Sequence, residues 1–198
     1  MVDRVRYAGK KNNFKIVEYT MSFCPAPAFL KIPNFGKPFP QCISYRNTAL
    51  TEILALKPNL IMLSSQRSNS TISKDIEEAY SYILKPISDA GIKSIVISDT
   101  PAPREDIPQC LSLHLTNSSY CDSPFNSYDP YPTLQSIGKQ WNVPVINPTN
   151  WFCTAIDCPA VVNQIIVYRD NSHISTAFAK SLSEKIYPYI EVGLRSKN

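Results

Sequence analysis

Short apolar runs alternate with amphipathic helical patterns along most of this chain. Three runs have the length and apolar character of buried strands: Leu60–Ser65, Lys93–Ser98 and Val143–Asn147. Three segments place apolar residues at helical spacing: Asn47–Leu56, Ser73–Ala90 and Pro130–Trp141. This alternation predicts an α/β fold, in which a flavodoxin-like parallel sheet is covered by helices on both faces and ligands bind at the carboxyl ends of the strands.

The segments between these elements carry further expectations. Phe14–Tyr19 has the pattern of a strand, and the Pro-rich residues 28–41 that follow are expected to form a loop. Asn47 is a candidate helix cap, and Pro86 predicts a kink or an early end of its helix. The polar stretch Arg104–Tyr128 is expected to be a long loop.

Length and composition limit the function classes. The 198 residues fit one domain, 1–198, with a substantial core, and 43% apolar against 18% charged residues excludes a disordered tail or a coiled coil. The net charge is +4, but the basic residues are scattered without interleaved aromatics, so no nucleic-acid partner is expected. The apolar runs are too short to span a bilayer, and no secretory signal opens the sequence.

The six cysteines fall into three local couples in Pro-rich, loop-like segments: Cys24 with Cys42, Cys110 with Cys121, and Cys153 with Cys158. Six cysteines allow many other pairings, so the sequence alone does not prove this one. Local disulfides indicate an oxidising compartment, whereas the alternative is a set of buried thiols in a cytosolic protein. The sequence has no Cys-x-x-Cys motif and only two histidines, so no metal site is expected.

An Asp-x-x-His pattern is the main candidate for chemistry. Asp170 and His173 follow an apolar run, Val161–Tyr168, that is expected to be the last strand, and precede a helical pattern, Ile174–Ile190. In such a loop His173 can take a proton from a nucleophile while Asp170 orients the imidazole. The alternative is that Asp170 and its neighbours only cap the helix.

Several blocks occur in an order that resembles a known family. They are Cys24-Pro25, Cys42 before Tyr45-Arg46-Asn47, Pro58-Asn59, Ser98-Asp99-Thr100-Pro101, Asn150-Trp151-Phe152-Cys153 with Cys158-Pro159, and Tyr168 to Ser175. Over about residues 13–190 the chain resembles the SGNH (GDSL-like) hydrolase domain that is fused behind membrane-bound acyltransferases of the acyltransferase-3 class. The resemblance implies that His173 and Asp170 are catalytic.

The chain departs from the family pattern at the nucleophile. The family places its catalytic serine in a Gly-Asp-Ser motif at the end of the first strand, and this sequence contains no Gly-Asp-Ser. We therefore expect the first strand and part of the following helix to be missing, which leaves an incomplete domain. The resemblance implies Gly36 and Asn69 as oxyanion-hole candidates, for which a turn and a surface loop are the alternatives. Arg67, in the same loop as Asn69, and Trp151, near the expected mouth of the site, are candidates for substrate binding. For Trp151, packing over a disulfide is the alternative.

The resemblance implies an extracytoplasmic esterase or O-acyltransferase without a cofactor. Its partners would be a donor of an acyl group, expected to be acetyl, and a polysaccharide, peptidoglycan or glycolipid acceptor. A membrane acyltransferase domain would lie upstream in the parent protein. The domain would lie at the cell surface or in the periplasm, tethered to the membrane. Because the serine motif is absent, the chain alone is expected to be inactive. The alternatives are a non-catalytic binding or scaffold domain at the cell surface, and a truncated remnant.

Overall fold

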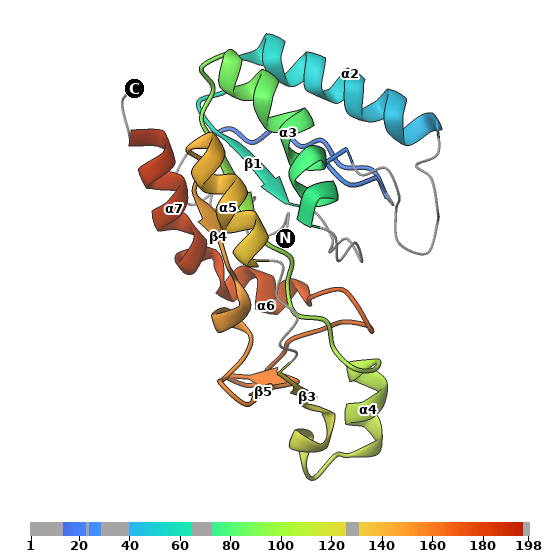
Figure 1. Cartoon of the computed structure of the whole chain (residues 1–198). Helices are drawn as coiled ribbons and strands as arrows, with labels where there is room; N and C mark the ends of the chain where they lie inside the picture. Colours follow the sequence, from blue (N-terminus) through green and yellow to red (C-terminus); the bar gives the residue numbers. More distant parts are fainter. Residues whose placement is uncertain (1–13, 23, 29–39, 65–72, 126–130, 196–198) are drawn as a thin grey trace. The chain divides into compact units, whose positions relative to one another are not determined.

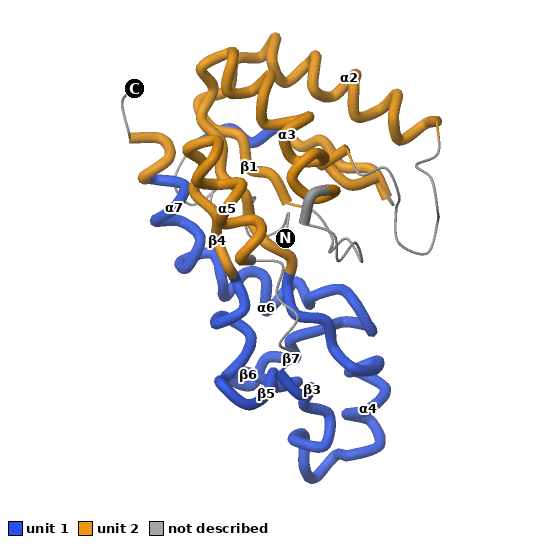
Figure 2. Tube along the Cα trace, in the orientation of Figure 1, with its two compact units in different colours: residues 1–17, 100–128, 148–191 blue, residues 18–99, 129–147, 192–198 orange. Residues whose placement is uncertain are grey.

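The structure, a computed structural model, describes residues 14–22, 24–28, 40–64, 73–125 and 131–195 (Figure 1). The chain divides into two compact units, which Figure 2 shows in different colours. Unit 1 comprises residues 1–17, 100–128 and 148–191, and unit 2 comprises residues 18–99, 129–147 and 192–198. Each unit has its own hydrophobic core.

Unit 2 contains a parallel sheet with the strand order β1-β2-β4. Its strands are β1 (Ile61–Ser64), β2 (Ser94–Ile97) and β4 (Val145–Ile146). In the register of the sheet, Ile61 pairs with Ser94 and Val96 pairs with Val145. All four residues of β2 are buried, as expected for the central strand of a sheet that is covered on both faces. The parallel sheet predicted from the three apolar runs is therefore confirmed.

Helices cover this sheet. On one face, Ile61, Leu63 and Val96 join a core with residues of α3 (Ser73–Asp89) and α5 (Tyr131–Trp141). Apolar residues of α2 (Pro40–Leu56) pack against the same core. Side chains alternate between the faces of a strand, so Ile95 points to the other face. There it lies close to Gly193, in the last turn of α7 (Ser183–Arg195).

Two sequence expectations about α2 are wrong. The helix begins at Pro40, not near Asn47, so it includes the end of the stretch expected to be a loop. Proline suits the first turn of a helix because the N–H groups there have no acceptor within the helix. Asn47 therefore lies inside the helix and caps nothing. Its side-chain oxygen accepts a hydrogen bond of 2.9 Å from the hydroxyl of Tyr82.

Two further expectations fail in unit 2 and in the segment that leads into it. Phe14–Tyr19 has no regular secondary structure. An alternating run becomes a strand only where a neighbour accepts its hydrogen bonds, and none of the described strands pairs with it. The helix α3 does not end early at Pro86 but continues to Asp89. It closes at Gly91, which has φ +67°, and the Ile92 N–H donates to the Ile87 carbonyl.

Unit 1 contains a helix where a long loop was expected. Within the stretch Arg104–Tyr128, residues Ile107–Leu113 form α4, followed by η1 (Ser118–Cys121). Asp106 caps α4 by accepting a hydrogen bond of 2.9 Å from the backbone N–H of Gln109. The Asp-Ile-Pro sequence that opens the helix is a capping signal that the polar composition of the stretch obscured.

Small antiparallel pairs and helices complete unit 1. A two-stranded pair joins β3 (Ser123–Pro124) to β5 (Asp157–Cys158), and η2 (Thr149–Trp151) lies between them in sequence. The helix expected over Ile174–Ile190 is divided into α6 (Thr176–Ser181) and α7. The break is at Leu182, which is buried in the core of unit 1, so packing fixes the turn between the two helices.

The prediction that Val161–Tyr168 forms the last strand of the parallel sheet is wrong. It forms an antiparallel hairpin of β6 (Val161–Val162) and β7 (Ile165–Ile166). Asn163 and Gln164 connect the strands with φ values of +50° and +64°. Two successive residues with positive φ form the type I′ turn that suits a two-residue hairpin. A continuous apolar run concealed this reversal of the chain.

We expect Gln164→Gly to stabilise unit 1 by about 0.5–1 kcal/mol, because glycine adopts positive φ without steric cost and Asn-Gly is the preferred type I′ sequence. Urea unfolding measures the change as a higher midpoint. Gln164→Ala is the control, since alanine keeps the β-carbon. A gain as large in the alanine variant would show that backbone strain at this position is not the cause.

The three disulfides are those suggested by the spacing. Cys24 is bonded to Cys42 in unit 2, and Cys110–Cys121 and Cys153–Cys158 lie in unit 1. The Cys110–Cys121 disulfide joins α4 to η1, and both of its cysteines are in the core of unit 1. The expectation of local disulfides is therefore confirmed.

Candidate active site

The loop that carries Asp170 and His173 follows the β6–β7 hairpin in unit 1. An isolated antiparallel bridge pairs Tyr168 with Ile174, and the Arg169 N–H donates to the His173 carbonyl at 2.8 Å. Tyr168 is buried, and its hydroxyl donates a hydrogen bond of 2.6 Å to the carbonyl of Pro101. The two ends of the loop are thus held together, and one of them is fixed in the core.

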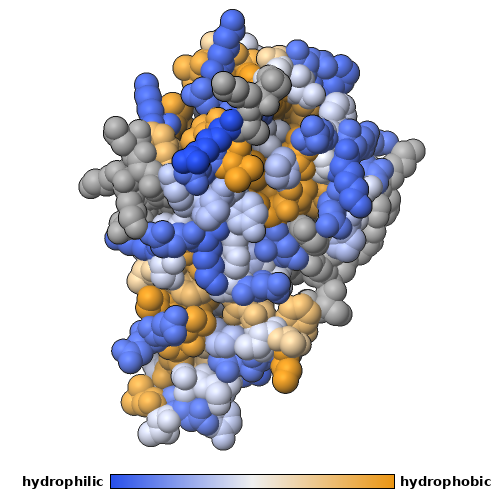
Figure 3. Space-filling model, turned by 90° about the vertical axis from the view of Figure 1, so that its left-hand side faces the viewer, coloured by the Kyte–Doolittle hydropathy of each residue, from blue (hydrophilic) through white to orange (hydrophobic). Residues whose placement is uncertain are grey.

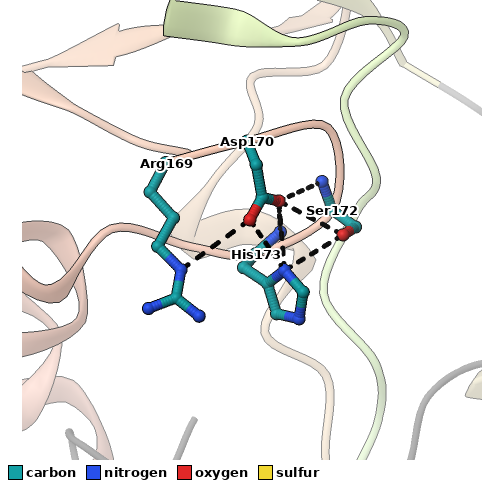
Figure 4. A network of polar contacts seen from close by, with 4 residues as sticks. All are labelled: Arg169, Asp170, Ser172 and His173. Carbon is teal, nitrogen blue, oxygen red and sulfur yellow. Dashed lines mark hydrogen bonds and ion pairs between the residues drawn. The ribbon is translucent and has the colours of Figure 1, made fainter. Parts of the chain in front are cut away.

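Asp170 and His173 are in direct contact (Figure 4). The Nδ1 atom of His173 lies 2.8 Å from Oδ2 and 3.1 Å from Oδ1 of Asp170. A charged carboxylate can only accept hydrogen bonds, so Nδ1 carries the proton in the neutral imidazole. The other ring nitrogen, Nε2, then presents its lone pair. This arrangement is the one in which a carboxylate sets the tautomer of a histidine base.

The backbone of the loop also binds the Asp170 carboxylate. Oδ1 accepts hydrogen bonds from the N–H of His173 at 2.6 Å and from the N–H of Ser172 at 2.8 Å. Burial by itself would raise the pKa of the Asp170 carboxyl. The hydrogen bonds from the two backbone N–H groups and from the His173 ring outweigh burial and lower the pKa to about 2. The carboxylate is therefore charged at any pH at which the domain would work.

This pKa predicts a pH dependence of stability. Because the pKa of Asp170 in the folded chain lies below its ordinary value of 3.8, folding favours the charged form. The resulting stabilisation is complete well above pH 3.8 and is lost as the pH falls from 3.8 through about 2. The difference in free energy of unfolding between the wild type and Asp170→Asn, from urea titrations, should therefore shrink in that interval. A difference that grows on acidification would contradict the assignment.

The imidazole of His173 is accessible. Its side chain is 63% exposed, and Nε2 points away from Asp170 in Figure 4. None of the described residues forms a hydrogen bond with Nε2, which leaves this atom able to take a proton from a bound reactant. The capping alternative applies to a different residue. Ser175 caps α6, and its hydroxyl accepts a hydrogen bond from the N–H of Phe178.

Two residues of the network were not predicted. The hydroxyl of Ser172 lies 3.2 Å from both Asp170 Oδ1 and His173 Nδ1. The Nε atom of Arg169 lies 3.8 Å from Asp170 Oδ2. The only indication in the sequence was that both residues lie close to Asp170, one on each side of it. Ser172 contacts Nδ1 of His173, the nitrogen that is hydrogen-bonded to Asp170, and not Nε2. Its hydroxyl is therefore not placed to be activated as a nucleophile by Nε2.

The other predicted residues have separate positions. Trp151 is half-buried in η2, packs against the core of unit 1 and lies with its ring 6.3 Å from that of Tyr189. Its neighbour Phe152 is fully in that core, against Phe178. The predicted oxyanion residues Gly36 and Asn69, and Arg67, lie outside the described residues. The second histidine, His114, is exposed at the end of α4 and stacks on Tyr120.

Hydrophilic side chains surround smaller hydrophobic areas on the face shown in Figure 3. None of the described helices combines the length and apolar character needed to cross a membrane. Within the described ranges, no three His, Cys, Asp or Glu residues are arranged to hold a metal ion.

Comparison with known proteins identifies the family. The structure is similar to that of the periplasmic domain of a lipopolysaccharide acetyltransferase from Salmonella ser. Paratyphi A, with a TM-score of 0.70 and 17% identity over 96% of this chain and 78% of that chain. It also matches an acetyl xylan esterase, with a TM-score of 0.47 and 14% identity over 74% of this chain and 75% of that chain. No curated protein sequence matches.

A family model described as "SGNH domain (fused to AT3 domains)" matches residues 1–188, which include the Asp170–His173 loop. The match extends over nearly the whole sequence and through both units. The chain therefore belongs to the family of SGNH domains that are fused to AT3 domains.

Proposed function

We propose that this domain transfers an acyl group, most simply acetyl, to or from sugar hydroxyls of the cell envelope. His173 is the general base, and Asp170 orients it. The contact between Asp170 and Nδ1, with Nε2 accessible, carries this proposal. It is the arrangement that activates a hydroxyl for attack on an ester carbonyl. The membership of the SGNH family supports the same chemistry.

The nucleophilic serine is proposed to come from a Gly-Asp-Ser segment outside residues 1–198. The sequence contains no such motif, and Ser172 contacts the wrong nitrogen of His173. In the described sheet β1 pairs on one side only, with β2, which is consistent with a further strand beside it. We treat 1–198 as one domain of that longer protein, because a single family model spans both units.

The proposed reaction has two stages. Nε2 of His173 takes the serine proton as the serine oxygen attacks the acyl donor, and the imidazolium that forms is stabilised by the Asp170 carboxylate. His173 then returns the proton to the leaving alcohol. A sugar hydroxyl, or water, next gives its proton to Nε2 and attacks the acyl-serine. His173 returns this proton to the leaving serine oxygen, which releases the product and restores the free serine and the base. Gly36 and Asn69 are proposed to stabilise the oxyanion, and Arg67 and Trp151 to contact the acceptor.

The proposed location is extracytoplasmic, with a membrane acyltransferase domain in the same protein as the source of the acyl group. The fusion to AT3 domains that characterises the family supports this partner, and the similar Salmonella domain is a periplasmic part of a lipopolysaccharide acetyltransferase. The three disulfides are consistent with an oxidising compartment. The acceptor class proposed is therefore a polysaccharide, peptidoglycan or glycolipid.

Hydrolysis of p-nitrophenyl acetate tests where the serine is. Residues 1–198 alone should hydrolyse it no faster than the His173→Ala variant, because the base has no nucleophile to activate. The same chain extended by its natural upstream residues should show a rate that depends on His173. A His173-dependent rate in residues 1–198 alone would show that the nucleophile lies within this chain.

A non-catalytic binding domain at the cell surface is the second candidate. The absence of a serine hydroxyl at Nε2 among the described residues favours it. It predicts that the upstream residues contain no Gly-Asp-Ser and that the longer protein still lacks esterase activity. Sequencing the upstream DNA distinguishes the two candidates.

A further inference from the structure

Arg46 is a buried cation that contacts a disulfide in unit 2. The residue projects from α2 and is only 7% exposed. Its Nη2 atom lies 3.5 Å from the sulfur of Cys42, and its Nε donates a hydrogen bond of 3.2 Å to the carbonyl of Pro25. Within the described part of the chain, no carboxylate pairs with this guanidinium. Burial lowers the pKa of Arg46, but arginine stays charged in proteins.

The guanidinium of Arg46 favours a negative charge on the Cys42 sulfur, and the position of Cys42 in its helix favours the same charge. Cys42 is the third residue of the 17-residue helix α2. Unpaired N–H groups and the helix dipole favour negative charge in the first turn. A thiolate formed at Cys42 would therefore be stabilised by two independent features, the guanidinium and the helix end. Stabilising the reduced form of a disulfide makes that disulfide easier to reduce.

The two cysteines differ in burial. Cys42 is fully buried, whereas Cys24 is half-buried. An external thiolate should therefore attack Cys24 in preference to Cys42, and Cys42 is the leaving group in that attack. A leaving thiol with a low pKa departs faster, so the less buried cysteine and the better leaving group are arranged for reaction in one direction.

We propose that the Cys24–Cys42 disulfide is a site of thiol–disulfide exchange with an external dithiol. One thiolate of the dithiol attacks Cys24 Sγ and forms a mixed disulfide, while the S–S bond breaks and Cys42 leaves as a thiolate beside Arg46. The second thiol of the reagent then attacks its own sulfur in the mixed disulfide and releases Cys24. Two electrons pass to the chain, and the dithiol becomes a disulfide.

Unit 2 retains other links around this site. The hydrogen bond from Arg46 to Pro25 and a bond of 3.0 Å from the Ala28 N–H to the Ala79 carbonyl hold the same segment, residues 24–28. Neither bond depends on the sulfur–sulfur bond. We therefore expect the reduced form to stay folded, so that the exchange can be reversed.

The Cys153–Cys158 disulfide is an internal control in the same molecule. It also joins a half-buried cysteine to a buried one, but no cation of the described residues is hydrogen-bonded to either sulfur. In the Cys110–Cys121 disulfide both cysteines are buried. Burial alone would make Cys24–Cys42 and Cys153–Cys158 equally reactive. The contact with Arg46 distinguishes Cys24–Cys42 from the other.

The test equilibrates residues 1–198 with glutathione buffers of increasing reducing strength, blocks the free thiols, and maps each cysteine by mass spectrometry. Cys24–Cys42 should open in the least reducing buffer, and glutathione should be found on Cys24. Replacing Arg46 by Gln should shift its equilibrium toward the oxidised form on the order of tenfold. Arg104→Gln, at an exposed arginine paired with Glu105, is the matched control and should cause no shift.

Prior opening of Cys153–Cys158, or glutathione on Cys42, would overturn the proposal. Circular dichroism reports whether Arg46→Gln folds. If it does not fold, the order of opening and the position of the adduct in the wild-type chain decide the outcome, because neither needs a variant. If it folds and its equilibrium equals that of the wild type, the assigned role of Arg46 is wrong.

Discussion

Replacing His173 by Ala in a longer protein that carries the Gly-Asp-Ser segment is expected to lower kcat/KM for p-nitrophenyl acetate by roughly 10²–10⁴-fold. The loss follows from the geometry of the loop, because Nε2 is the atom placed to take the serine proton and no other described side chain shares that position. Initial rates at a fixed pH, compared with the wild type, measure the effect.

Asp170→Asn and His114→Ala complete this experiment. Asp170→Asn should also reduce kcat/KM strongly, since an amide can donate to Nδ1 and so favour the wrong tautomer of His173. His114→Ala is the matched control, because His114 is the only other histidine and stacks on Tyr120 at the end of α4. A His173→Ala enzyme as active as the His114→Ala enzyme would exclude His173 as the base.

Replacing Gly138 by Ala is expected to destabilise unit 2 by about 2 kcal/mol. Gly138 lies in α5, and a β-carbon there would be 2.6 Å from the carbonyl oxygen of Val143 and 2.5 Å from Cγ2 of Val145. Neither group can yield easily, because one is backbone and the other belongs to a β-branched residue in β4. The strain exceeds the roughly 1 kcal/mol that alanine gains over glycine in a helix.

Gly193→Ala is the matched control for this substitution. A β-carbon at Gly193, in α7, would meet the side-chain ends of Leu60 and Ile95 at 3.0–3.2 Å. Flexible side-chain ends can move by the few tenths of an ångström required, so we expect a change within about 0.5 kcal/mol after the gain in helix propensity. Equal urea midpoints for the two variants would show that α5 can move away from β4.

The sheet and most of its helices could be predicted because their sequences carry strong periodic signals. β1, β2 and α5 lie where apolar runs and helical spacing placed them. Prediction failed where tertiary partners decide the outcome. Phe14–Tyr19 alternates like a strand but pairs with none of the described strands. Pro86 lies in the last turn of α3, where the single hydrogen bond it removes does not end the helix.

The contact between Asp170 and His173 was predicted, but the position of their loop in the fold was not. The Asp-x-x-His spacing indicated the contact between Asp170 and His173, because three residues are enough for a carboxylate to reach an imidazole within one loop. The loop was expected at the end of a parallel strand, whereas it follows a hairpin. The turn residues Asn163 and Gln164 adopt positive φ without the glycine that usually signals such a turn.

The hydrogen bonds that orient His173 all arise within residues 166–175, from the bridge between Tyr168 and Ile174 to the cap at Ser175. The orientation of the base is therefore set locally, while Tyr168, which donates to the Pro101 carbonyl, fixes the loop in the core of unit 1. A nucleophile supplied from elsewhere would meet a histidine that is already oriented.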